Sequence, residues 1–248
     1  MLQAFYSATV GAQQQMQRLN VYANNISNVN TYGYKAQVPA FQALMYGMLD
    51  GIDGSQLPRG SGTVMALTGT DMGDGAMEET GRNLDYAIVG DGFFAVYEPA
   101  TGEVTFTRDG SFTMNAYQEV EEGAEGEEPV VNTVYYLCDG EGRQVLGPDG
   151  YPIPMTDPNQ ELNIGVFTIQ YKDGLERVGS GRFAMGEKNG LVWASDSKVL
   201  QGFLESSNAD LANELSGVIE AQRSYSYVLR MMTTADDVET TINALANG

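Results

Sequence analysis

The residue types that carry most enzyme chemistry are scarce in this chain. Its 248 residues include no histidine and one cysteine, Cys138. Without histidine, Ser–His–Asp and Cys–His catalysis are excluded, as are the ordinary zinc ligand sets. A single cysteine cannot form an internal disulfide, so we expect Cys138 to be a buried small hydrophobic residue.

Carboxylates are abundant, but no arrangement of them marks an active site. The chain has 33 Asp and Glu residues, so its composition permits a glycosidase-type pair, yet no pair stands out. Six glutamates fall within residues 119–128 and predict an exposed loop between strands, with calcium binding as the alternative. Gly90, Asp91 and Gly92 make no nucleotide-binding fingerprint, because strand residues follow in place of a helix. We therefore expect neither catalysis nor a cofactor or metal.

The charge distribution argues against two classes of partner. The net charge of −20 opposes nucleic acid and anionic membrane surfaces. Residues 1–35 contain two basic residues and no acid, whereas 205–248 contain seven acids and two basic residues, so most of the excess lies between them. No apolar run approaches the roughly eighteen residues of a membrane span, and we expect no membrane insertion. The N-terminal residues lack the basic and apolar regions of a cleavable signal peptide.

Residues 1–30 are predicted to form an amphipathic helix. All eight prolines fall between Pro39 and Pro158, so neither end of the chain is interrupted. Apolar residues recur in steps of four and three, as on one helix face: Ala12, Met16, Leu19, Ala23 and Ile26. The sequence NNISNVN then predicts the helix end, because asparagine tolerates the left-handed conformation and competes for backbone hydrogen bonds.

Residues 208–246 are predicted to form a second helix, roughly 55 Å long. Ser207 followed by Asp210 resembles a capping box at its start. Its apolar residues hold one face over more than nine turns: Leu211, Leu215, Val218, Tyr225, Leu229, Met232, Ala235, Val238, Ile242 and Leu245. Both stripes are too long for the core of a short domain, so we interpret them as partner-seeking surfaces. The most natural contact of each helix is the other.

The middle of the chain has a β pattern. Between residues 80 and 204, short runs of β-forming residues are bounded by Gly, Asp or Asn, as in GFFAVYE, VVNTVYYLCDG and GVFTIQY. Residues 36–79 are rich in glycine and predict an irregular connecting segment. The predicted fold class is α+β: a discontinuous helical domain from residues 1–35 and 205–248, a connecting segment over 36–79, and a mainly β outer domain, a barrel or sandwich, over 80–204.

Four segments, in order, resemble the bacterial flagellar basal-body rod and hook axial proteins. ANNISNVNTYGYK (residues 23–35) is similar to the family's N-terminal signature. TGRNLDYAIVGDGFFAV (80–96) and FTRDGSF (106–112) resemble its two central motifs, and residues 200–245 resemble its C-terminal helix. The length is closer to the rod subunits than to the longer hook protein.

This resemblance implies a structural, non-enzymatic subunit of the flagellar basal-body rod that transmits torque from motor to hook. It implies export through the flagellar type III apparatus without a cleavable signal. It also implies a helical homo-oligomer, with other rod and hook subunits as further partners, in which the terminal helices form an inner tube and the β domain faces outward.

The residues expected at the assembly interface lie on the two helices, where asparagine amides bridge subunits or act as ordinary helix caps. They are Met16, Leu19, Asn24, Asn25, Ile26, Asn28, Leu211, Leu215, Val218, Gln222, Tyr225, Leu229, Met232 and Ile242. Two alternatives remain at this stage: a hook subunit, and a secreted protein that binds or cleaves peptidoglycan.

Overall fold

The computed structural model describes residues 2–43, 47–50, 56–59, 63–121, 130–160 and 162–246. The chain divides into two compact units. Unit 1 comprises Met1–Val29, Ala36–Asp71 and Ala209–Gly248, and unit 2 comprises Asn30–Lys35 and Met72–Asn208. The two long helices and the mostly β centre confirm the α+β class.

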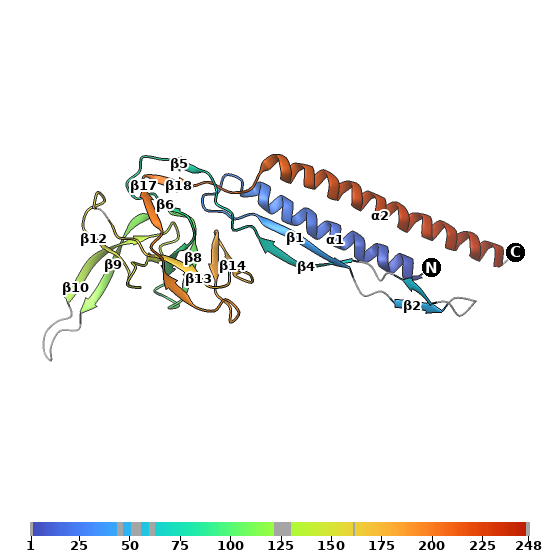
Figure 1. Ribbon diagram of the computed structural model, residues 1–248, viewed down its shortest axis with the longest axis horizontal. Coiled ribbons are helices and arrows are strands. Elements are labelled where there is room, and N and C mark those ends of the chain that lie inside the picture. The colour runs from blue at the N-terminus through green and yellow to red at the C-terminus, as the bar shows by residue number, and fades with distance from the viewer. Residues whose placement is uncertain are drawn as a thin grey trace. The chain divides into compact units, whose positions relative to one another are not determined.

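Unit 1 contains the two long helices. Figure 1 shows them side by side and antiparallel, so that both chain termini lie at the same end of the pair. Its elements are α1 (Leu2–Ser27), β1 (Gln37–Ala43), β2 (Gly47–Asp50), β3 (Gln56–Arg59), β4 (Thr63–Thr70) and α2 (Leu211–Ala246). The predicted pairing of the two ends of the chain is therefore confirmed.

Side chains contribute capping hydrogen bonds at the C-terminal end of α1 and at the N-terminal end of α2. At the end of α1, the Asn28 side chain and its backbone N–H both donate to the carbonyl oxygen of Asn24 in the last turn of the helix. At the start of α2, the Asp210 carboxylate accepts the backbone N–H of Ala212. Asp210 is thus the N-cap, and the helix begins three residues later than predicted, without the Ser207 capping box.

Residues 36–71 are more regular than their sequence predicts. β1 pairs antiparallel with β4 from Gln37↔Thr70 to Ala43↔Thr63, with a register shift between Ala40 and Phe41. β2 pairs with β3 in the same way. We expected an irregular connecting segment because of its glycines, but cross-strand pairing supplies backbone hydrogen bonds that do not depend on side chains. These residues belong to the same compact unit as the helices.

Unit 2 is built from short antiparallel strands. They are β5 (Met77–Glu79), β6 (Tyr86–Val89), β7 (Phe93–Tyr97), β8 (Val104–Thr107), β9 (Thr113–Glu121), β10 (Val130–Cys138), β11 (Gln144–Val145), β12 (Pro154–Met155), β13 (Val166–Ile169), β14 (Glu176–Gly179), β15 (Arg182–Ala184), β16 (Val192–Ala194), β17 (Lys198–Gln201) and β18 (Phe203–Glu205). The main sheet runs β12-β10-β11-β7-β8-β15-β14, and β17–β6 and β18–β5 form separate pairs. The predicted Glu-rich loop between β9 and β10 falls largely on residues 122–129, outside the described residues.

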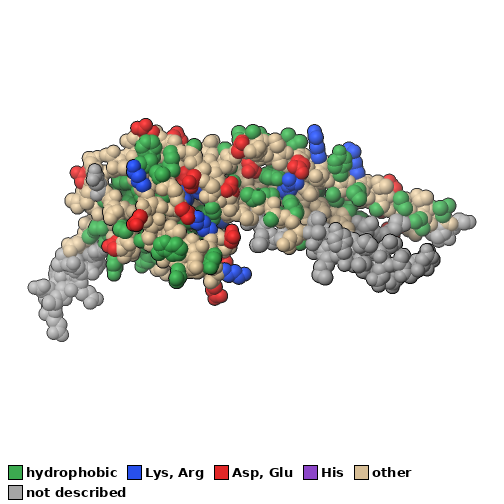
Figure 2. All heavy atoms as spheres, in the orientation of Figure 1, with side chains coloured by type: hydrophobic (Ala, Val, Ile, Leu, Met, Phe, Trp, Pro, Cys, Tyr) green, Lys and Arg blue, Asp and Glu red, His purple; other side chains and the backbone are tan. Residues whose placement is uncertain are grey.

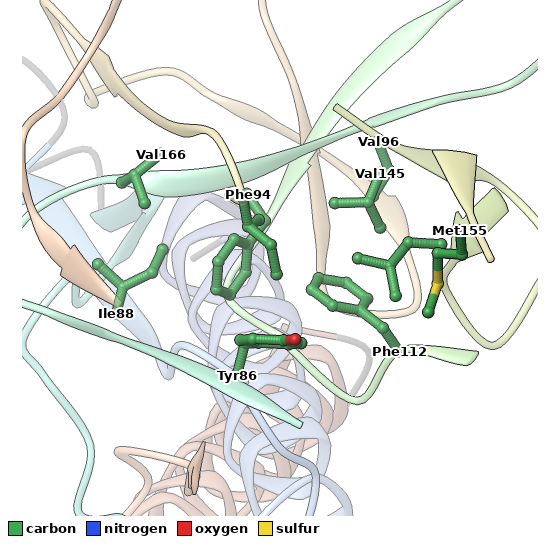
Figure 3. Close-up of a cluster of buried hydrophobic side chains, with 10 residues drawn as sticks. Tyr86, Ile88, Phe94, Val96, Phe112, Val145, Met155 and Val166 are labelled. Atoms are coloured by element: carbon green, nitrogen blue, oxygen red, sulfur yellow. The ribbon is translucent and has the colours of Figure 1, made fainter. Parts of the chain in front are cut away.

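Two hydrophobic clusters form the core of unit 2. In the larger one the rings of Phe94 and Phe112 meet edge to face, with centroids 5.2 Å apart, and Tyr86 lies beside them (Figure 3). The smaller cluster gathers around Phe93, Phe106 and Phe183. Phe93 and Phe94 are consecutive in β7 and enter different clusters, because successive side chains of a strand point to opposite faces of the sheet. Cys138 is buried as expected, and burial raises the pKa of its thiol to about 11.

Candidate assembly interface

The contact between α1 and α2 uses small residues. Ala221 of α2 is fully buried, and Val21 of α1 is nearly so. Gly217 lies directly against the ring of Tyr22, where an added Cβ would meet ring carbons at 2.5–2.8 Å. The helices can approach closely at this point only because Gly217 has no side chain.

Asn25 bridges α1 to two other elements of unit 1. Its side chain is 0 % exposed. Its Nδ2 donates to the carbonyl oxygen of Gln37 at 2.9 Å and to Glu214 Oε1 at 3.0 Å, while its Oδ1 accepts the Gln37 N–H at 2.9 Å. Burial raises the pKa of the Glu214 carboxyl, the Asn25 hydrogen bond opposes this rise, and nearby Asp210 adds to it. Asn25 therefore bridges parts of one chain in this structure.

Two further polar contacts set the register of unit 1. Arg18 of α1 pairs with Glu220 of α2 at 3.3 Å, and its guanidinium lies over the rings of Tyr22 and Phe41. The buried Gln14 side chain accepts the backbone N–H of Met65 at 2.6 Å. A polar side chain at a buried position of α1 is thus paired with β4, as buried polar groups generally must be.

Unit 2 contains a buried cluster of three charged side chains. Lys35 Nζ lies 2.6 Å from Glu205 Oε1, and Arg108 Nη1 lies 3.0 Å from Glu205 Oε2. All three side chains are 1–2 % exposed. Both oxygens of the Glu205 carboxylate therefore meet a cation in a site that is closed to solvent.

Backbone groups complete this cluster. Lys35 donates to the carbonyl oxygen of Gly73 at 2.7 Å, and Glu205 Oε1 also accepts the N–H of Gly75 at 2.8 Å. Arg108 donates to the carbonyl oxygen of Gly90 at 2.8 Å. The cluster thereby joins three segments distant in sequence, which explains why Lys35, Arg108 and Glu205 each lie within a motif. No local pattern in the sequence indicates that they meet.

The structure divides the expected interface residues between exposed and partly buried positions. Asn25 is buried, whereas Leu19, Ile26, Asn28, Val218, Tyr225 and Met232 are half-buried. The exposed members are Met16, Asn24, Leu211, Leu215, Gln222, Leu229 and Ile242. Met16 has 58 % of its surface exposed.

A second group of apolar residues on α2 is also exposed, although it lies outside the apolar face predicted from the sequence. Tyr227 is 61 % and Met231 is 67 % exposed, and Ile219 is also exposed. At about 100° per residue, Tyr227 and Met231 lie on one side of the face that packs against α1, and Leu211, Leu215 and Leu229 lie on the other, with Ile219 one turn beyond Leu215. α2 therefore presents apolar side chains on both flanks of its contact with α1. Surface hollows lie along this helix, one of them lined by Tyr227, Arg230, Met231, Thr234, Ala235 and Val238.

The described part of the chain presents no candidate metal centre. It contains no group of three or more His, Cys, Asp or Glu residues placed to hold a metal ion. The described helices include none that is both long and apolar enough to cross a membrane.

Three segments of the chain match families of flagellar proteins. Residues 5–35 match "Flagella basal body rod protein", and residues 200–245 match "Flagellar basal body rod FlgEFG protein C-terminal". Residues 87–128 match "Flagellar hook protein FlgE/F/G D1 domain". The matched segments contain most of α1 and α2, together with Lys35, Arg108 and Glu205.

Relatives align with nearly the whole chain. The flagellar basal-body rod protein FlgG of Buchnera aphidicola subsp. Baizongia pistaciae is 29% identical, with 96% of this chain and 97% of the relative covered. FlgG of Bacillus subtilis is also 29% identical, with the same coverage. The flagellar basal-body rod protein FlgF of Escherichia coli is 28% identical, with 94% of each chain covered.

Proposed function

Because this chain belongs to the flagellar basal-body rod protein family, we propose that it is a structural rod subunit that polymerises through its two terminal helices. The observation that carries this proposal is the exposed apolar surface of α1 and α2. On α2, large apolar side chains are exposed to solvent on both sides of the face that packs against α1. On α1, Met16 is exposed as well. Burying one such side chain contributes about 1.5–3 kcal/mol, so contact between copies has a clear driving force.

Polymerisation of this kind couples assembly to the ordering of the helices. Helices gain most of their stability from packing of an apolar face, and little from propensity alone. α1 and α2 cover only part of each other, and neighbouring copies would cover the rest. The expected interface residues Leu211, Leu215, Leu229 and Ile242 are well placed for such contacts because they are exposed.

The family implies a location in the flagellar basal body and assembly with other rod and hook subunits. We further propose export by the flagellar type III apparatus without a cleavable signal peptide, a helical homo-oligomer, and transmission of torque from motor to hook. The hook-subunit alternative is not favoured, because the full-length relatives are named as rod proteins. The family is structural, and we propose that this chain has no catalytic activity.

The test is the assembly of the purified chain as its concentration increases. The wild-type chain should pass from monomer to elongated polymer, as followed by sedimentation and electron microscopy. The double variant Tyr227→Ser/Met231→Ser should remain monomeric over the same range, because it removes two of the most exposed apolar groups of α2.

The matched control is Tyr151→Ser/Tyr171→Ser, which removes two exposed aromatic rings from unit 2 and leaves both helices intact. This control should polymerise like the wild type. A wild-type chain that stays monomeric at every concentration, alone and with its rod partners, would refute the proposal.

A further inference from the structure

The last turns of α2 extend beyond α1. Across the helix pair, Gly217 faces the Tyr22 ring and Gly11 faces Val228, and in both pairs the two residue numbers add to 239. Extended to the first residue of α1, this antiparallel register places Leu2 opposite position 237. Figure 1 shows α2 projecting past the N-terminal end of α1. The turns of α2 after this position therefore lie beyond the start of α1.

A stripe of exposed apolar side chains follows α2 into this projecting end. At about 100° per residue its members lie within about 60° of one another, as on one helix face. We call it the α2 stripe, and its residues, which are 44–78 % exposed, are Tyr227, Met231, Val238, Ile242 and Leu245. Figure 2 shows hydrophobic side chains, in green, on the exposed surface where α2 ends. One chain therefore leaves an apolar surface roughly 27 Å long open to solvent.

α1 presents a matching stripe on the side away from β1 and β4. We call it the α1 stripe, and its residues, which lie within about 40° of one another, are Phe5, Ala12, Met16 and Ala23. It lies roughly opposite Gln14 and Asn25, whose side chains bond β4 and β1. Phe5 is 42 % and Met16 is 58 % exposed. The two stripes have the same length along their helices, roughly 27 Å each.

Charge distinguishes α1 from the other helix surfaces as a partner for the α2 stripe. Residues 227–245 contain three acids, Asp236, Asp237 and Glu239, and one basic residue. A two-fold contact of the α2 stripe with itself would bring these acids of both copies to the same level, where they repel. Residues 211–226 contain two further acids and one basic residue, whereas α1 contains one basic residue and no acid. α1 is therefore the helix that meets the α2 stripe without repulsion between acids.

The direction of the helices favours an antiparallel contact. In a polymer whose axis follows the helices, all copies point the same way, so α1 of one copy is antiparallel to α2 of every other copy, as it is within one chain. The first turn of α1 carries no acid and the last turn of α2 carries no basic residue, so neither helix compensates its own dipole. Antiparallel packing brings the positive end of α1 beside the negative end of α2.

We propose that the α1 stripe of one copy docks antiparallel on the α2 stripe of a second copy. This contact rests on the proposed polymerisation and identifies the two surfaces that mediate it. Alignment of the stripes end to end pairs Phe5 with Leu245, Ala12 with Val238, and Ala23 with Tyr227. In two of these three pairs an alanine meets a larger side chain, which suits knobs-into-holes packing. Because two different surfaces meet, the contact is heterologous and builds an open chain of copies unless it closes into a ring.

The test is disulfide cross-linking of Ala12→Cys/Val238→Cys in the full-length chain. Within one chain, Ala12 is level with position 227, so Val238 lies about eleven residues, or roughly 16 Å, further along α2. A disulfide requires Cα atoms less than about 7 Å apart, so these two cysteines can join only different copies. Oxidation of the polymer should give a ladder of covalent multimers, and oxidation of the dilute monomer should give none.

The matched control is Ala12→Cys/Thr240→Cys. Thr240 is exposed half a turn from Val238, on the side of α2 away from the stripe, so this variant should give no ladder. The wild type should give none either, because Cys138 is buried. When Ala12→Cys chains are copolymerised with Val238→Cys chains, mass spectrometry of the linked peptides should find disulfides between unlike chains alone.

A second variant, Phe5→Ser/Met16→Ser, measures the contribution of the α1 stripe to assembly. It should raise the critical concentration for polymerisation at least tenfold, because it removes the two large side chains of that stripe. Its control is Gln17→Ser, at an exposed position of α1 outside the stripe, which should assemble like the wild type. Circular dichroism of each dilute variant checks that the helices still form.

Three results would overturn the proposal. They are a polymer of Ala12→Cys/Val238→Cys that gives no ladder, copolymers whose disulfides join like chains, and a Phe5→Ser/Met16→Ser chain that assembles like the wild type. Failure of the wild type to polymerise would instead contradict the proposed function, and this contact with it.

Discussion

At the scale of single residues, buried polar groups organise both units. Glu205 holds two cations in unit 2, and Asn25 satisfies both the N–H and the carbonyl of Gln37 in unit 1. A buried ion cluster often contributes little net stability, because desolvation offsets the attraction. Removing one member is costly, however, because the remaining charges stay buried without compensation. The Glu205 cluster should behave in this way.

We expect Glu205→Gln to lower the free energy of unfolding of unit 2 by about 3–5 kcal/mol, since Lys35 and Arg108 would remain buried without their carboxylate. Urea denaturation of the dilute chain, followed by near-ultraviolet circular dichroism, measures the change. The control is Glu239→Gln at an exposed position, which should change stability by less than about 0.5 kcal/mol. Equal effects of the two substitutions would contradict a structural role for the cluster.

Glu214 should make the helix pair sensitive to pH. Burial raises the pKa of its carboxyl, so the folded state binds a proton more tightly than the unfolded state does. The contribution of this group to stability is therefore present below its unfolded pKa and is lost as pH rises through its folded pKa. In Glu214→Gln, the loss of helix-pair stability between mildly acidic and neutral pH should be smaller than in the wild type. Helical circular dichroism in urea at several pH values tests this. The same slope in both proteins would contradict it.

At the scale of elements, the contact between α1 and α2 depends on which helix positions are occupied by glycine. Two helical glycines face the partner helix with different clearances. An added Cβ at Gly217 would meet the Tyr22 ring at 2.5–2.8 Å, whereas one at Gly11 would lie 3.9 Å from Val228, an ordinary van der Waals distance. Helix propensity alone favours alanine over glycine by about 1 kcal/mol at both positions. Packing therefore decides the outcome at each.

Gly11→Ala should stabilise the helix pair by about 0.5–1 kcal/mol, and Gly217→Ala should destabilise it, because the Tyr22 ring must move. The midpoint of urea unfolding, followed by helical circular dichroism, gives the sign for each variant. Adding Tyr22→Ala to Gly217→Ala should remove the clash and recover part of the loss. If both alanine variants were stabilised alike, the close approach at Gly217 would be wrong.

At the scale of the whole molecule, the two units differ in how fully they are covered. Unit 2 encloses two hydrophobic clusters of buried residues. The helices of unit 1 leave large apolar side chains exposed, including Tyr227 and Met231. Segments with few buried apolar contacts open at lower free energy than a packed core does. The isolated chain should therefore be stable in unit 2 and labile in its helices.

Hydrogen exchange of the dilute monomer should show faster exchange in α1 and α2 than in β7, β8 and β13. In the polymer, the helices should become protected while exchange in unit 2 changes little, because assembly covers the exposed flanks. Mass spectrometry of peptides from both states measures this. Helices that are already as protected as the central strands in the monomer would argue against assembly-coupled ordering.

Sequence periodicity was sufficient to predict the helices and most strands. It did not predict which face of each helix packs against the other helix. The hydrophobic pattern predicts both long helices, and the β-forming runs predict strands such as β7, β10 and β13, all confirmed. Hydrophobicity did not identify the contact between α1 and α2, which uses Gly217 and Ala221, because a close approach selects small residues over large ones. The hydrophobic pattern also failed to predict β1 and β4, because these strands are stabilised by backbone hydrogen bonds to each other.

By itself the sequence determined the α+β class, the absence of histidine chemistry and the resemblance to flagellar rod proteins, because these depend on composition, local periodicity and short motifs. Only the tertiary structure decided that Lys35, Arg108 and Glu205 meet in a buried cluster, and that Asn25 bridges three elements of one chain. It also decided which apolar side chains of α2 remain exposed. Such pairings join residues up to 189 positions apart, and local sequence does not specify a partner at that distance.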